Sequence, residues 1–262
     1  MLGGSKLING GRAVPADSQN VNERLSEQVS ALYRNAGPGT YGSLFAGAIL
    51  SGMLYFSSAI PLWSTLTFNI ILSANSIARL FLLRAYRRKK PPLAEWRKWA
   101  WAATASALGG GICWGSASIL LMDPSRVEFQ FIVVLACAGL SAGSIAAFGT
   151  YLPTYYASLF PMMVPTVIWA AYQNDPIHWT YAILGSLWIV IMAMIARTVC
   201  RSLVQSLRLQ LENLALANDL RIQKESAEDA NMAKSRFLAA ASHDLRQPVH
   251  ALEMFVGALA AQ

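Results

Sequence analysis

The chain has 262 residues, of which 55% are hydrophobic and only 13% are charged. Soluble domains carry a charged fraction of roughly 25%, so this composition favours a membrane protein. The net charge of +7 does not indicate nucleic-acid binding, because residues 84–98 alone hold seven basic residues and one acidic residue.

Residues 1–40 are polar and carry mixed charges, and we assign them to a cytoplasmic N-terminal segment. The stretch SEQVSALYR within them is compatible with a short amphipathic helix, which the sequence GPG at 37–39 is expected to break. No apolar stretch precedes Tyr41. We therefore expect no cleavable signal peptide, and the first membrane span should itself direct insertion.

Six apolar runs follow, each close to the ~20 residues that a helix needs to cross a bilayer. They form a six-span transmembrane sensor domain over residues 41–199, with a tight turn at Pro61 between the first two. If the basic loop at 84–98 is cytoplasmic, both termini are cytoplasmic as well. The runs lie at about 41–60, 61–83, 99–121, 129–150, 152–172 and 177–199.

Small residues and prolines interrupt several of these runs. Gly111 with Gly115, and Gly139 with Gly143, have the spacing of close helix–helix contacts. Two prolines in the fifth run each remove a helical hydrogen bond, which predicts either a structural kink or a hinge beside a ligand pocket. The candidate sensor site combines aromatic, amide and proline residues, although ordinary interhelical bonding would also explain the amides: Asn69, Asn75, Tyr155, Tyr156, Pro161, Pro165 and Trp169.

Charged and metal-binding side chains give little sign of a site within the runs. Arg79 is one turn from the basic end of its run and is expected to snorkel toward it. His178 lies at a membrane boundary without an evident partner. We expect no metal site, because the three histidines are too far apart in sequence. The cysteines are expected to be small buried hydrophobic residues: Cys113, Cys137 and Cys200.

Residues 200–231 have the pattern of a signalling coiled-coil linker. Apolar residues recur at steps of three and four and end on a polar residue, which predicts a parallel homodimer. The alternative is a single amphipathic helix lying on the membrane. The positions of the seam are Val204, Leu207, Leu211, Leu214 and Asn218.

Residues 232–262 form a second amphipathic pattern, which places His243 on the polar face. His243 is two residues from both Ala241 and Leu245 of the apolar stripe, a rotation of roughly 200°. The imidazole is therefore expected to face solvent. The adjacent Asp244 could accept a hydrogen bond from one ring nitrogen and orient the other. Pro248 cannot donate to the carbonyl of Asp244, which predicts a helix bend.

The stretch KSRFLAAASHDLRQPVHAL resembles the phosphoacceptor box of bacterial sensor histidine kinases. The resemblance implies that residues 232–262 are the incomplete first helix of the dimerisation and phosphotransfer domain. His243 would accept the γ-phosphoryl group of ATP, with Asp244 as the assisting acid and Arg246 in contact with phosphate or the response regulator. Gln247 would occupy the phosphatase position, where threonine or asparagine is commoner.

The resemblance further implies an all-α membrane protein, in which a six-helix bundle leads into a long cytoplasmic helix. ATP and Mg²⁺ would be bound by a catalytic domain outside this chain, so the chain alone is expected to be inactive. Expected partners are a second copy, a response regulator or fused receiver domain, membrane lipid, and a small-molecule signal that is lipophilic or fatty-acid-like. The expected location is the bacterial inner membrane.

Two other classes of protein fit parts of the pattern. A small transporter or channel with a cytoplasmic tail is one, although the runs show no inverted repeat and few charges. A membrane anchor whose tail only dimerises is the other. Both would leave His243 without a chemical role.

Overall fold

The computed structural model describes the backbone of residues 16–260, in which all the regular secondary structure is helical. Side chains are described for most residues between 22 and 238 and for Pro248. The chain divides into two units, Met1–Val204 and Gln205–Gln262. The elements are α1 Ala16–Phe56, α2 Leu62–Lys89, the 3-10 turn η1 Leu93–Glu95, α3 Trp96–Gly115, α4 Ala117–Leu120, α5 Val127–Phe148, α6 Leu152–Gln173 and α7 Pro176–Ala260.

Three helices of the described chain are long and apolar enough to cross a membrane. They are α2, α5 and the part of α7 from Pro176 to Leu238. Large apolar side chains are exposed along them, including Ile70 of α2 and Phe131 of α5, as expected of helices that face lipid. These properties indicate an all-α membrane protein.

The first helix is longer than the sequence predicts, and the predicted break at GPG is wrong. Helix α1 runs from Ala16 to Phe56 with Pro38 inside it. Proline removes one backbone hydrogen bond and costs about 3 kcal/mol in a helix interior. Tyr33 and Ala36 before it and Thr40 after it are buried. This burial on both sides holds the segment in helical conformation despite the proline.

The tight turn between the first two long helices is confirmed. Helix α1 ends at Phe56 and α2 begins at Leu62, with Pro61 at the N-cap. Ser58 in the turn has a φ of 55°. The amide of Ala59 donates to the carbonyl of Leu54 at 2.9 Å, which closes the turn.

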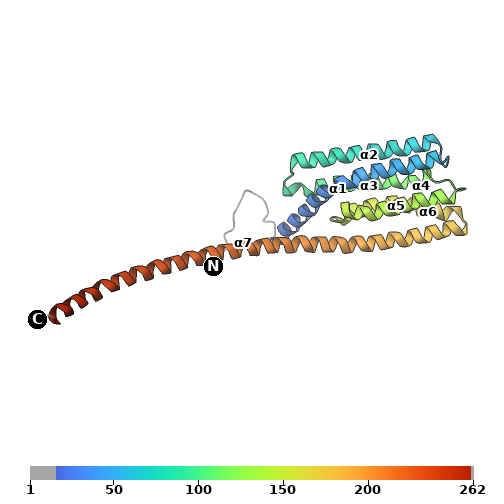
Figure 1. Cartoon of the computed structure of the whole chain (residues 1–262). Helices are drawn as coiled ribbons and strands as arrows, with labels where there is room; N and C mark the ends of the chain where they lie inside the picture. The colour runs from blue at the N-terminus through green and yellow to red at the C-terminus, as the bar shows by residue number, and fades with distance from the viewer. Residues whose placement is uncertain (1–15, 261–262) are drawn as a thin grey trace. The chain divides into compact units, whose positions relative to one another are not determined.

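Within the first unit, the helices lie side by side (Figure 1), and α3 packs closely on α6. The predicted contact through Gly111 and Gly115 is confirmed, because these glycines lie against the backbone of Ser158 and Pro161. The matching prediction for Gly139 and Gly143 is wrong. A Cβ at either position would have no heavy atom within 4 Å.

The first part of α7 is joined to its neighbours in the first unit through side chains. It bonds to α5, to α6 and to the loop between them, at positions spread from its first turn to Cys200. The bonds are His178 Nε2 with Gln130 Oε1 at 2.9 Å, Trp188 Nε1 to Ser141 Oγ at 2.9 Å, Tyr156 Oη to the Ala193 carbonyl at 3.4 Å, and Cys200 Sγ to the Thr150 carbonyl at 3.7 Å. The three cysteines are free and buried, as predicted.

In the second unit, α7 carries exposed ion pairs one turn apart. Arg208 Nε lies 2.7 Å from Glu212 Oε1, and Arg221 Nε lies 2.9 Å from Glu225 Oε1. Such pairs support a helix by only a few tenths of a kcal/mol each. Leucines are exposed between them, at Leu209, Leu214, Leu216 and Leu220.

Candidate functional site

The structure places the predicted sensor residues at several separate positions in the first unit. Tyr155 is buried and donates from Oη to the Ser141 carbonyl at 3.3 Å, whereas Tyr156 donates to α7. Trp169 contacts His178 edge to face, with ring centroids 5.5 Å apart. Asn69 donates to Ser51 Oγ of α1 at 2.7 Å, an ordinary bond between helices.

Two of the prolines of α6, Pro161 and Pro165, lie on its contact with α3. The carbonyl of Pro161 and the ring of Pro165 both lie against Gly115. Proline at 165 cannot donate to the carbonyl of residue 161, which leaves that oxygen free to approach α3. Pro161 and Pro165 therefore shape a helix contact in the described structure.

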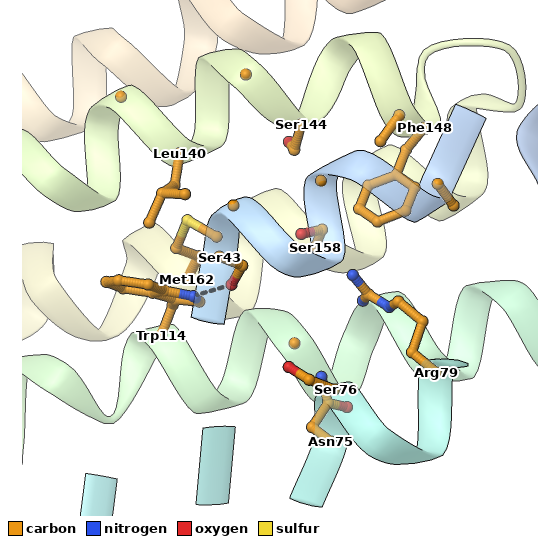
Figure 2. A pocket seen from close by; sticks show the side chains of 17 residues that line it. Ser43, Asn75, Ser76, Arg79, Trp114, Leu140, Ser144, Phe148, Ser158 and Met162 are labelled. Atoms are coloured by element: carbon orange, nitrogen blue, oxygen red, sulfur yellow. Dashed lines mark hydrogen bonds between the residues drawn. The ribbon is translucent and has the colours of Figure 1, made fainter. Parts of the chain in front are cut away.

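A cavity of about 200 Å³ lies between α1, α2, α3, α5 and α6, and Asn75 is the one predicted sensor residue that lines it. Its polar lining consists of four serines, one amide and one guanidinium. Figure 2 shows Arg79 and Phe148 at one end of this space, with Trp114, Leu140 and Met162 at the other. The polar residues are Ser43, Ser76, Ser144, Ser158, Asn75 and Arg79.

Arg79 lines this cavity and bonds to α3 through two of its nitrogens, and its snorkelling toward the basic end of α2 stays a prediction. Its Nε donates to Ser106 Oγ at 3.1 Å, and its Nη2 donates to the Ser106 carbonyl at 2.9 Å. Its Cζ lies 5.1 Å from the ring centroid of Phe148. These contacts hold the guanidinium between α3 and Phe148, the last residue of α5.

Three consecutive glycines of α3 make room for these neighbours. A Cβ on Gly109 would lie 2.6 Å from Asn75 Oδ1, and one on Gly110 would lie 2.8 Å from Arg79 Nη2. A Cβ on Gly111 would meet the Ser158 carbonyl oxygen at 2.5 Å. Each glycine therefore allows a different close approach, two by polar side chains of α2 and one by the backbone of α6.

Exposed glycines form part of the cavity lining on the side of α1 and α5. Gly39 and Gly42 of α1 and Gly139 and Gly143 of α5 line the cavity and are exposed. A Cβ on Gly42, Gly139 or Gly143 would meet nothing within 4 Å, whereas a Cβ on Gly39 would lie 3.5 Å from the Cβ of Ala147. The cavity is therefore unobstructed at Gly42, Gly139 and Gly143.

A second polar cluster lies around His178, which does have partners, contrary to the prediction. The His178 side chain is buried, and its Nδ1 contacts Asp175 Oδ2 while its Nε2 contacts Gln130 Oε1. Gln130 is also buried and donates from Nε2 to the Asp123 carbonyl at 2.6 Å. The cluster thus joins the start of α7 to α5 and to the loop that precedes α5.

Asp175 also caps α7. Its Oδ1 accepts hydrogen bonds from the amides of Ile177 and His178, both at 3.0 Å, and Pro176 occupies the first helical position. The pKa of Asp175 is lowered below its ordinary value, chiefly by the hydrogen bond from the His178 amide. The His178 side chain lowers this pKa further. In the loop before α5, hydrogen bonds from Ser125 lower the pKa of Asp123.

The backbone of the phosphoacceptor-like motif is helical, since α7 continues to Ala260 with Pro248 inside it. The side chains of His243, Asp244, Arg246 and Gln247 lie outside the described residues. Their orientation therefore stays a prediction from the sequence.

Sequence reasoning missed the cavity and the His178 cluster. One signal for both was visible: a charged or amide side chain within an apolar run, at Arg79 and at Gln130. Comparison of the chain with family models, curated proteins and solved structures finds no match.

Proposed function

We propose that this chain is the sensor and signalling portion of a bacterial sensor histidine kinase. In this proposal, six helices span the inner membrane, both termini are cytoplasmic, and two copies pair through residues 200–231. The membrane bundle responds to a small lipophilic signal and controls phosphorylation of His243.

The observation that best supports the proposal is the continuity of α7. This one helix, Pro176–Ala260, contains both the residues that bond to α5 and α6 and the motif with His243. Because α7 is joined to its neighbours through side chains, a ligand that rearranged these contacts would shift or rotate the helix. Small shifts of helices are a known means of switching.

The chemistry follows from the residue types of the motif. A neutral imidazole nitrogen of His243 attacks the γ-phosphorus of ATP, the bond to the bridging oxygen breaks, and ADP leaves. Asp244 accepts a hydrogen bond from the other ring nitrogen and stabilises the positive charge that develops there. Mg²⁺ would be held with ATP by a catalytic domain and would supply charge neutralisation at the phosphate oxygens. The phosphoryl group then passes to a carboxylate of the response regulator.

A labelling experiment with the natural full-length protein tests this proposal. The protein in membranes is incubated with ATP labelled at the γ-phosphate, and His243→Gln is compared with His250→Gln. His250 is a matched control, because it lies seven residues away on the same predicted helix. The proposal expects label in the wild type and His250→Gln and none in His243→Gln. Equal labelling of both variants, or none in the wild type, would favour a transporter, a channel or a simple anchor.

A further inference from the structure

We infer that the cavity around Arg79 binds a small carboxylate with a short apolar body, which reaches it from the bilayer between α1 and α5. Only the biological role of this ligand, as the signal, rests on the proposed function. Binding itself follows from the described residues.

The lining of the cavity carries a positive charge at Arg79. Arg79 lies in an apolar unit, and among the described residues no carboxylate lies within 4.0 Å of it and none lines the cavity. A guanidinium has five N–H donors. The Nε and Nη2 atoms each use one donor on Ser106. Arg79 is half-buried, and a cation taken partly out of water is disfavoured unless it is paired. A carboxylate is the planar partner that a guanidinium binds with two parallel bonds.

The size and shape of the cavity limit the ligands that fit it. The cavity has about 200 Å³, somewhat more than the ~150 Å³ cavity that accommodates benzene in another protein. It therefore has room for a ligand of roughly six to ten heavy atoms, and not for a phospholipid with two acyl chains. With Arg79 at one end and Trp114, Leu140 and Met162 at the other, the cavity suits a ligand that is charged at one end and apolar at the other (Figure 2).

Exposed glycines give access to the cavity from outside the first unit. Three exposed glycines line the cavity: Gly42 of α1 and Gly139 and Gly143 of α5. A Cβ on any of them would have no neighbour within 4 Å. Helix α5 is also one of the candidate membrane spans. An amphiphile dissolved in the bilayer could therefore enter between these helices without a change in the backbone.

The test measures binding by the purified full chain in detergent, by calorimetry, to three probes with the same hexyl chain. Hexanoate carries the carboxylate, hexan-1-ol has no charge, and hexyl phosphate represents a lipid headgroup. We expect hexanoate to bind and hexanol not to bind. Arg79→Gln should weaken hexanoate binding about ten- to hundredfold, because a charged hydrogen-bonded pair is lost. Hexyl phosphate binding in place of hexanoate would overturn the carboxylate assignment, as would unchanged binding by Arg79→Gln.

A second set of variants addresses access and does not disturb Arg79. Gly139→Leu and Gly143→Leu should obstruct the opening and abolish hexanoate binding. Gly52→Leu is the matched control: a Cβ there also has no neighbour within 4 Å, but Gly52 does not line the cavity. Equal binding by all three variants would overturn the proposed route. These measurements do not use phosphorylation, so they can fail or succeed independently of labelling at His243.

Discussion

The carbonyl oxygen of Ser158 in α6 would lie only 2.5 Å from a Cβ atom placed on Gly111 of α3. The two helix backbones therefore meet at this point with no side chain between them. Gly139 of α5 is the natural contrast, since a Cβ there would meet nothing within 4 Å. The same residue type thus has opposite roles on two helices of one unit.

Gly111→Ala should destabilise the first unit, and Gly139→Ala should not. Forcing a methyl group against the Ser158 backbone requires α3 and α6 to separate, at a cost of about 1–3 kcal/mol. In contrast, Gly139→Ala gains helix propensity of up to ~1 kcal/mol. Thermal unfolding of both variants in detergent measures the difference. Equal destabilisation by the two substitutions would contradict this account of α3–α6 packing.

The contrast also shows which parts of the fold could be predicted from the sequence. The turn at Pro61 and the apolar runs are local features. Helices α2, α5 and the start of α7 agree with three of the runs as candidate membrane spans, whereas the run at 99–121 is divided between α3 and α4. The spacing of Gly111 with Gly115 is the same as that of Gly139 with Gly143. Spacing predicts that two glycines share a helix face, but not whether another helix or a cavity lies opposite that face.

The candidate sites depend on contacts between residues far apart in the chain. Arg79 bonds to Ser106, 27 residues away, and His178 contacts Gln130, 48 residues away. No local pattern identifies such partners. The break predicted at Pro38 fails for a related reason, because the burial of Tyr33 and Thr40 outweighs the local preference of proline.

Removing the His178 imidazole should weaken the attachment of α7 to α5. His178→Ala leaves the buried Oε1 of Gln130 without this partner, which costs about 1–3 kcal/mol. A cycle of His178→Ala, Gln130→Ala and the double variant isolates the interaction, with an expected coupling of about 0.5–3 kcal/mol. Chemical unfolding in detergent provides the measurement. Strictly additive effects would mean that the two side chains do not interact.

Lowering the pH should protonate Asp175 and so remove the negative charge from the N-terminal cap of α7. Because folding lowers the pKa of Asp175, the ionised group contributes stability above its unfolded pKa. That contribution is lost as the pH falls through the folded pKa, which lies below the ordinary value of 3.8. Amide hydrogen exchange at Ile177 and His178 measures this contribution of Asp175 to the stability of the helix start. Protection should be greater in wild type than in Asp175→Asn at pH 7, and the difference should vanish in acid. A difference that persists at low pH would contradict the assignment.

The predicted dimer seam can be tested with two leucines of similar exposure. Leu214 belongs to the seam, whereas Leu216 is two residues away, roughly 200° around the helix. Leu214→Cys in membranes should form a disulfide between two copies under oxidation, and Leu216→Cys should not. The native cysteines are buried in the first unit and supply the background control. Crosslinking at 216 and not at 214 would exclude the proposed seam.

The most direct test locates the phosphoryl group on the natural full-length protein. Trypsin cleaves after Arg236 and Arg246, which separates His243 from His250 into different peptides. After incubation with ATP, peptides sequenced at neutral pH should carry phosphate on His243, in a form that acid removes and alkali does not. An acid-stable phosphate on Ser242, or phosphate only in the peptide with His250, would contradict the account.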